Sequence, residues 1–144
     1  MYTPANLSEA QERIRKGQAS CVIMRDGHIV DEAIGIGVKP ILQFLESSSL
    51  KDAEVADKIV GKAAAMLLTL GGVKYVYGEL MSVSGKEFLE KRGIAASYGK
   101  LIDRINNRDN TGMCPLEESV IDTDEPSKGY EAIKKTVARL MAAK

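Results

Sequence analysis

Two short segments of this 144-residue sequence concentrate residue types that could do chemistry, and each leads into a predicted helix. In the first segment, residues 56–65, Asp57 is predicted to cap the helix, and Lys62 is a charge within an otherwise nearly apolar run. If Lys62 faces a cavity, its ammonium could hold an anion or, once desolvated, act as a base. The alternative is a solvent-exposed stripe, because charged residues on helices are usually solvated. That stripe would comprise Lys58, Lys62, Ala65 and Thr69.

The second segment, residues 107–117, places a cysteine before a proline that suits the first position of a helix. Cys114 would then be the N-cap residue, where the free amides of the first turn favour the thiolate. Glu117 would follow at the third helical position and could line the same pocket. The alternative is that Cys114 is a small buried residue and Glu117 only a charge near the helix N-terminus. Three residues of the preceding loop are candidate ligand-binding groups, although a local ion pair of the first two is the commoner outcome: Arg108, Asp109 and Thr111.

The composition excludes several classes of function. Lysine and arginine together number 20, as do aspartate and glutamate, so the balanced charge argues against a nucleic-acid partner, which needs a basic surface. The single histidine, His28, excludes any metal site or proton relay that needs two histidines, and it is expected to be exposed and inert. Two cysteines are too few for a disulfide scaffold, and no segment resembles a signal peptide or a membrane span. A cytoplasmic protein with reduced thiols and no membrane partner is therefore expected.

Capping residues, glycines and hydrophobic periodicity predict an alternation of helices and strands. Asp26-Gly27 indicates a tight turn between two strands, and the run from Lys58 to Leu70 is apolar on nearly every face, as expected of a buried helix. The predicted helices cover residues 8–16, 40–46, 57–70, 84–92, 115–121 and 128–141, and the predicted strands cover residues 20–24, 29–33, 53–56, 73–81 and 95–101.

This order of elements predicts one α/β domain over residues 1–144. A hairpin followed by two strand–helix–strand crossovers gives a mixed sheet, because a hairpin joins antiparallel strands and a crossover joins parallel ones. The expected architecture is three-layer α/β/α, with a five-stranded sheet and the central helix packed against it.

The same order, with polar residues at the start of two helices, resembles the cytidine deaminase-like fold. Residues 56–67 and 107–117 are similar to the two signature stretches of one prokaryotic domain-of-unknown-function family, which is placed in that superfamily by its fold. The resemblance covers the chain from Leu7 to Leu140. It implies a site between the starts of the two helices, and it also implies a possible homo-oligomer, since deaminase-like domains commonly associate.

The zinc-binding residues of true deaminases are not retained in this sequence. Those enzymes carry His-x-Glu or Cys-x-Glu at the central helix and Pro-Cys-x-x-Cys at the next one. Here Val60 stands in place of the first ligand, Lys62 in place of the general acid–base glutamate, and Glu117 in place of the second cysteine. Only Cys114 remains, and one thiolate with one carboxylate does not make a three-ligand zinc site. No metal and no cofactor are therefore predicted.

Three hypotheses for function follow. The first is a metal-independent enzyme or ligand-binding protein for a small molecule, nucleotide-like or an amide, with Cys114, Lys62, Glu117 and Asp57 as catalytic residues. Lys62 is then predicted to lie beside Cys114 and Glu117, where its charge favours the thiolate of a candidate nucleophile. The alternative is a non-catalytic structural or partner-binding domain with a degenerate deaminase site. A zinc-dependent deaminase is the third and least favoured hypothesis.

Overall fold

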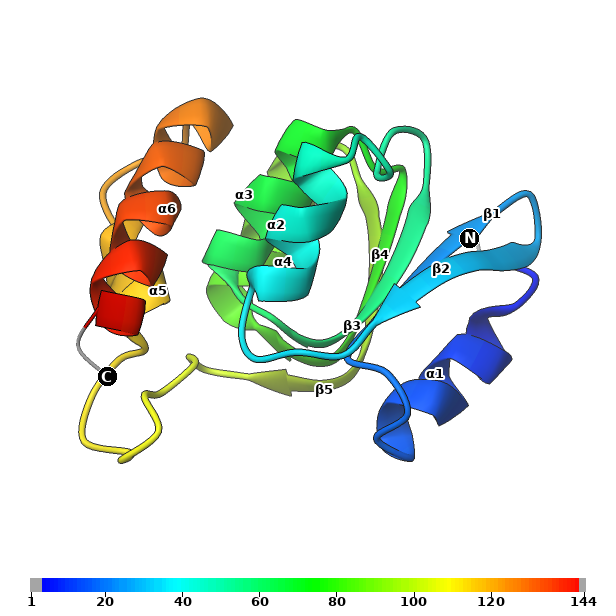
Figure 1. Cartoon of the computed structure of the whole chain (residues 1–144), viewed down its shortest axis with the longest axis horizontal. Coiled ribbons are helices and arrows are strands. Elements are labelled where there is room, and N and C mark those ends of the chain that lie inside the picture. Colours follow the sequence, from blue (N-terminus) through cyan, green and yellow to red (C-terminus); the bar gives the residue numbers. More distant parts are fainter. Residues whose placement is uncertain (1–3, 143–144) are drawn as a thin grey trace.

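The computed structural model describes residues 4–142, in which helices and strands alternate (Figure 1). All of the predicted elements are present, and their bounds differ most at the junction of β3 and α3. No helix within these residues is long and apolar enough to cross a membrane. The strands are β1 (Cys21–Arg25), β2 (His28–Ala33), β3 (Glu54–Val60), β4 (Tyr75–Ser82) and β5 (Ala95–Ile102). The helices are α1 (Leu7–Arg15), α2 (Lys39–Glu46), α3 (Lys62–Gly71), α4 (Val83–Lys91), α5 (Pro115–Ser119) and α6 (Pro126–Ala142).

The strands form one mixed five-stranded sheet in the order β2-β1-β3-β4-β5. β1 lies antiparallel to both β2 and β3, whereas β3, β4 and β5 run parallel to one another. The β1–β2 hairpin turns at Asp26 and Gly27, whose φ angles of 53° and 80° suit a tight Asp-Gly turn. The predicted mixed sheet is therefore confirmed, and β2 and β5 form its two edges.

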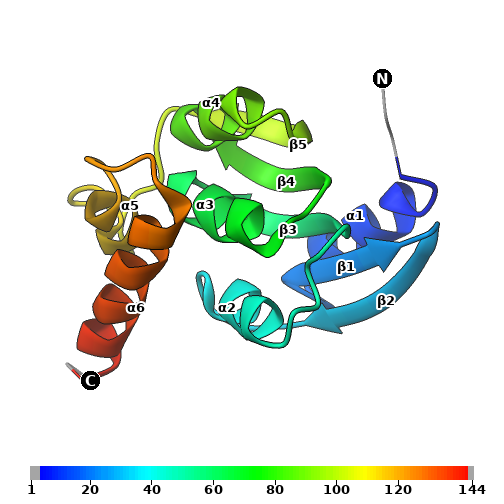
Figure 2. The same cartoon turned by 90° about the horizontal axis from the view of Figure 1, so that it is seen from above.

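Helices cover the two faces of the sheet unequally (Figures 1 and 2). α1 packs on one face, where Leu7, Ala10 and Ile14 are buried against Tyr75 and Tyr77. α2, α3 and α4 lie on the opposite face, and α5 and α6 pack against α3. α1, the sheet and the α2–α4 group form the expected three layers, and α5 and α6 lie outside them.

The central helix α3 is internal, as its apolar sequence predicts. Its residues 63–68 are all buried, because a helix that is apolar on most faces needs neighbours on most sides. α6 approaches it closely at Gly129, where a Cβ would lie 2.7 Å from Cε of Met66. The missing side chain at Gly129 thus allows the outer pair of helices to pack directly on α3.

β3 is longer than the sequence pattern indicates. Ile59 and Val60 are β-branched, which favours extended backbone, and they pair with Leu80 and Met81 of β4. The strand therefore continues to Val60, and the prediction of a helix beginning at Asp57 is wrong.

α3 begins only at Lys62, with Gly61 as its N-cap residue. Asp57 lies within β3 and caps no helix, which corrects its predicted role. The predicted solvent-exposed stripe is wrong as well, since Lys58 belongs to β3 and Ala65 is fully buried. The physical reason is that pairing with the neighbouring strands keeps residues 57–60 extended, although the sequence pattern predicts a helix there.

Two helices, predicted to begin at residues 8 and 84, each begin one residue earlier. α4 begins after Ser82, whose buried hydroxyl accepts a hydrogen bond from the Gly85 amide at 3.0 Å, and Ser84 lies inside the helix. The chain leaves β4 at Ser82, so this residue meets the free amides first. α1 likewise begins one residue before Ser8, which is internal to the helix.

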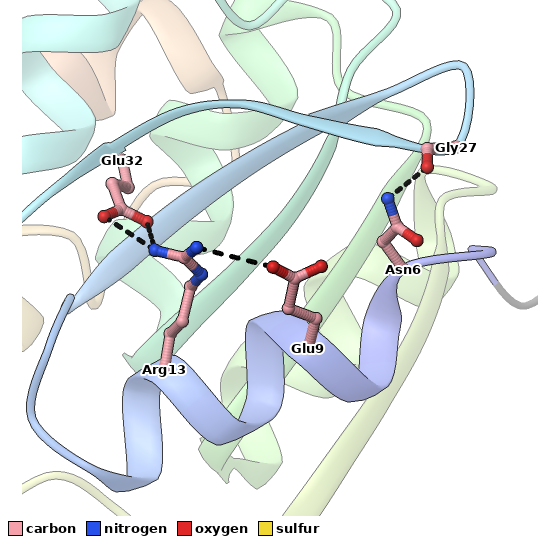
Figure 3. Close-up of polar contacts among 5 residues, drawn as sticks. All are labelled: Asn6, Glu9, Arg13, Gly27 and Glu32. Carbon is pink, nitrogen blue, oxygen red and sulfur yellow. Dashed lines mark hydrogen bonds and ion pairs between the residues drawn. The ribbon is translucent and has the colours of Figure 1, made fainter.

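Polar contacts attach α1 to the β1–β2 hairpin (Figure 3). Arg13 donates to both carboxylate oxygens of Glu32, at 2.8 and 3.0 Å, and to Glu9 one turn earlier at 3.4 Å. Asn6 donates to the carbonyl oxygen of Gly27 in the hairpin turn. These contacts hold α1 against the middle of the sheet, where it packs mainly on β3 and also touches β1 and β4.

Candidate functional site

The carboxylate of Glu117, on α5, binds the N-terminus of α3. Its two oxygens accept hydrogen bonds from the backbone amides of Lys62 at 2.9 Å and Ala63 at 2.8 Å. Glu117 is only 8% exposed, and burial raises the pKa of its carboxyl, although the two amides and the Lys62 charge act in the opposite direction. Glu117 thus satisfies two amides that the start of α3 would otherwise leave without partners.

Two glycines make room for this carboxylate and for the turn before α3. A Cβ on Gly61 would overlap with Glu117, lying 2.6 Å from its carboxylate carbon, and with Cδ1 of Ile105. A Cβ on Gly85 of α4 would lie 2.9 Å from the carbonyl carbon of Gly61. A larger side chain at either glycine would therefore displace the carboxylate or the turn itself.

The Lys62 side chain contacts the segment that follows α5. Its ammonium pairs with the Asp124 carboxylate at 3.0 Å and donates to the Ile121 carbonyl oxygen at 3.5 Å. The side chain is only 15% exposed, so Lys62 is not a solvated surface lysine. Its hydrogen bond and its charge lower the pKa of Asp124.

Cys114 is the N-cap residue of α5, as predicted, and its thiol is free and partly exposed. The thiol makes no cap hydrogen bond. The Cys114 amide donates to the Ile105 carbonyl oxygen at 2.9 Å, which places the start of α5 next to the residue that packs on Gly61. We refer below to Lys62, Cys114, Glu117 and Asp124 as the α3 N-terminal cluster.

The loop before α5 is held by its own side chains. Asn107 donates to the Thr111 hydroxyl at 3.1 Å and accepts from the Thr111 amide at 3.0 Å. Arg108 and Asp109 are exposed at the tip of this loop. Of the three candidate ligand-binding residues, Thr111 is thus used within the loop, and the other two face solvent.

Asp57 has different partners from the α3 N-terminal cluster. It lies directly opposite Cys21 in the pairing of β3 with β1, and both residues are buried. The Asp57 carboxyl accepts a hydrogen bond from the Ile59 amide at 3.2 Å, and the facing Cys21 thiol favours its charged form. Burial raises the pKa of Asp57 from 3.8 to about 7. Burial, reinforced by the charge of Asp57, raises the pKa of the Cys21 thiol well above its ordinary value.

Three residues of these two groups were missed by sequence reasoning. Asp124 has no motif that points to Lys62, and Ile105 is a single apolar residue in a polar loop. Cys21 is buried within β1, and its pairing with Asp57 requires β3 to extend beyond residue 56. The β-branched Ile59 was the signal that could have revealed this extension.

The cluster consists of groups that already have partners, together with one free thiol. Within residues 4–142, no three His, Cys, Asp or Glu side chains are arranged to hold a metal ion. A groove of about 680 Å³ lies elsewhere, between α1 and the start of β5, and no residue of the α3 N-terminal cluster lines it. In this geometry the Glu117 carboxylate therefore caps α3. Cys114 is a partly exposed thiol that could act as a nucleophile.

The two cysteines are expected to differ strongly in reactivity. Iodoacetamide at neutral pH should modify Cys114, which is partly exposed, at least about 100-fold faster than Cys21, which is fully buried and becomes accessible only when the sheet opens. Peptide mapping by mass spectrometry after timed labelling measures both rates, with Cys114→Ser as the control for site assignment. Equal labelling of the two thiols would contradict the burial of Cys21.

Comparison with known proteins identifies relatives over nearly the whole chain. The family model for TM1506, described as a domain of unknown function (DUF1893), matches residues 9–137. The crystal structure of a DUF1893 family protein (TM1506) from Thermotoga maritima at 2.70 Å resolution is similar to this structure, with a TM-score of 0.81. The two sequences are 25% identical, and the similarity covers 96% of this chain and 92% of that one. A comparison with curated proteins finds no match. Because the family model spans most of its length, this protein belongs to the DUF1893 family.

Proposed function

We propose that this chain is a non-catalytic binding domain with a cytidine deaminase-like fold, in which Glu117 closes the former catalytic position. Two features support the fold assignment: the strand order β2-β1-β3-β4-β5 with a parallel β3–β5 half, and the juxtaposition of α3 and α5 starts. The observation that carries the proposal is the bidentate contact of Glu117 with the Lys62 and Ala63 amides.

In a zinc deaminase, the start of this helix supplies a metal ligand and the glutamate that moves protons to and from the attacking water. Here Lys62 stands at the glutamate position, and its ammonium is paired with Asp124. The first amides of α3 are occupied by Glu117, which comes from the position of a zinc-binding cysteine. A substrate would have to displace a buried carboxylate to reach them, which favours a structural role for the cluster.

The Glu117→Gln variant tests this proposal, because a structural and a catalytic Glu117 predict opposite changes in the free energy of unfolding. We expect the free energy of unfolding to fall by about 1–3 kcal/mol, because the glutamine NH₂ is a donor and cannot accept from an α3 amide. Glu118→Gln is the matched control, since Glu118 is the next residue of α5 and is exposed. It should change stability by less than about 0.5 kcal/mol. Urea denaturation followed by circular dichroism measures both variants.

An unchanged or increased free energy of unfolding in Glu117→Gln would favour a catalytic role for Glu117. Residues kept for activity often cost stability, so replacing a catalytic Glu117 should leave the protein equally stable or more stable. A thermal-shift screen against nucleosides, nucleotides and amides accompanies the measurement. A ligand that stabilises the wild type and loses its effect in a fully stable Glu117→Gln would contradict the non-catalytic proposal.

A metal-independent enzyme with Cys114 as nucleophile is the second candidate, favoured by the free and partly exposed thiol at the N-cap of α5. This candidate requires Lys62 to act on the thiolate. Lys62→Met should then slow alkylation of Cys114 severalfold by removing a nearby positive charge. In the non-catalytic domain the rate stays unchanged, because the ammonium is directed to Asp124 and the Ile121 carbonyl.

A further inference from the structure

Asp57 and Cys21 place a carboxyl and a thiol side by side in the core, and the proposed function uses neither. The two residues lie directly opposite each other in the antiparallel pairing of β3 with β1. Just beyond them, the Lys58 amide donates to the Ser20 carbonyl oxygen at 2.9 Å. Cys21 and Asp57 therefore form a pair without hydrogen bonds between their own backbones, the kind of pair in which facing side chains approach most closely.

The Asp57 carboxyl is buried without a cation to balance its charge. Cys21 belongs to the core between the sheet and the helices α2 and α3, so the facing carboxyl lies on that side of the sheet. The Ile59 amide donates to it at 3.2 Å, and none of the ion pairs within residues 4–142 includes Asp57. An ionised Asp57 would thus lack both water and a counter-ion in this position, and such burial disfavours the charged form.

The elements packed around Asp57 supply no compensating positive charge. β4 presents Gly78 opposite it, and β1 presents the Cys21 thiol, whose pKa is raised by the charges of Asp57 and of Asp31 on β2. The two helices that cover this side each have a lysine at their first position, Lys39 on α2 and Lys62 on α3. Neither pairs with Asp57, and the Lys62 ammonium pairs with the Asp124 carboxylate.

The Cys21–Asp57 pair ends the β1–β3 ladder, and the chain around it lies at the surface. The turn before Cys21 is exposed and contains Gly17 with a φ angle of 74°. Lys58 and Ile59, which follow Asp57, are exposed as well. The end of a ladder separates at a lower free-energy cost than its centre. This pair can therefore open while the rest of the sheet stays folded.

We propose that ionisation of Asp57 separates the end of β1 from β3 and exposes the Cys21 thiol, so that the pair acts as a pH-sensitive gate on this thiol. In the closed pair, the protonated carboxyl is buried against the thiol. In the open pair, the carboxylate is hydrated and the hydrogen bond between Lys58 and Ser20 is broken. This inference concerns the β1–β3 ladder and does not rest on the role proposed for Glu117.

The direction of the pH dependence follows from which state holds the proton more tightly. Burial raises the pKa of Asp57 from 3.8 to about 7 in the closed pair, whereas a hydrated carboxylate in the open pair keeps a pKa of about 4. The closed pair holds the proton more tightly, so the equilibrium constant for opening rises between about pH 4 and pH 7 and levels off above. Burial also raises the pKa of the Cys21 thiol, which favours opening in the same direction at higher pH.

Thiol labelling measures this opening. In a Cys114→Ser background Cys21 is the single remaining cysteine, and its reaction with dithiodipyridine is followed by absorbance. Dividing its rate by the rate in a chain that also carries Asp57→Asn cancels the intrinsic pH dependence of the thiol. We expect this ratio to rise at least about 10-fold between pH 5 and pH 8. Asp31→Asn is the matched control, because it removes an exposed carboxylate and should preserve the rise.

The urea dependence of labelling separates local opening from global unfolding. Opening one strand end exposes little surface, so the labelling rate should rise much less steeply with urea than the global unfolding constant does. Hydrogen exchange of the Lys58 amide in the unsubstituted chain gives a second measurement that does not require Asp57→Asn to fold. Its protection, corrected for intrinsic exchange, should fall at least about 10-fold over the same pH range. A rate ratio that is constant with pH, a urea slope equal to that of global unfolding, or a pH-independent protection of Lys58 would each overturn the proposal.

Discussion

Replacing Gly61 with alanine is expected to lower the free energy of unfolding by about 3 kcal/mol. The backbone itself accepts alanine, since Gly61 is extended with φ −103° and ψ −169°, and in such a position alanine alone would stabilise slightly. The added Cβ overlaps with the Glu117 carboxylate and with Ile105. The carboxylate must therefore leave the α3 amides while it remains largely buried, and this accounts for the large cost.

Two comparisons isolate this cause. Gly112→Ala is the matched control, because a Cβ there meets nothing within 4 Å, and it should change stability by less than about 1 kcal/mol. In a Glu117→Ala background, Gly61→Ala should cost much less than in the wild type, since the carboxylate that it displaces is absent. Additive losses in the double variant would contradict a steric conflict between Gly61 and Glu117. Urea denaturation of the four proteins of this cycle supplies the coupling energy.

Asp57→Asn is expected to change how stability depends on pH. The pKa of Asp57 is about 7 in the folded protein, against an ordinary value of 3.8. The folded state therefore holds the proton more tightly than the unfolded state, so wild-type stability falls as the pH rises from about 4 to about 7. The accumulated loss is on the order of 4 kcal/mol at pH 8. Asparagine does not ionise, so Asp57→Asn should be several kcal/mol more stable than the wild type at pH 8 and similar to it below pH 4.

Glu117 contributes a slope of the same sign, because burial raises its pKa as well, so the Asp57→Asn profile should be flatter rather than flat. Asp31→Asn is the control, since it removes an exposed carboxylate from β2, which is separated from β3 by β1, and it should keep the wild-type slope. Chemical denaturation at pH 4, 6 and 8 gives the three profiles. A wild-type slope retained by Asp57→Asn would show that its carboxyl is already charged throughout this range.

Local sequence features determined much of the fold. The Asp26-Gly27 pair specifies a turn that few other residues accept, and the apolar run that ends at Leu70 requires a buried central helix. Pro115 suits the first position of α5 and so makes Cys114 its N-cap. These predictions succeeded because each depends on residues that are neighbours along the chain.

Contacts between distant segments were decided only by the tertiary structure. Glu117 reaches the backbone amide of Lys62 across 55 residues of chain, and no periodicity or motif encodes that contact. The same holds for Asp57, which pairs with Cys21 because β3 extends further than its first residues indicate and adopts one register beside β1. Strand register and helix docking depend on how all buried surfaces fit together. The sequence by itself therefore indicated the candidate residues, and tertiary packing determined which residues they contact.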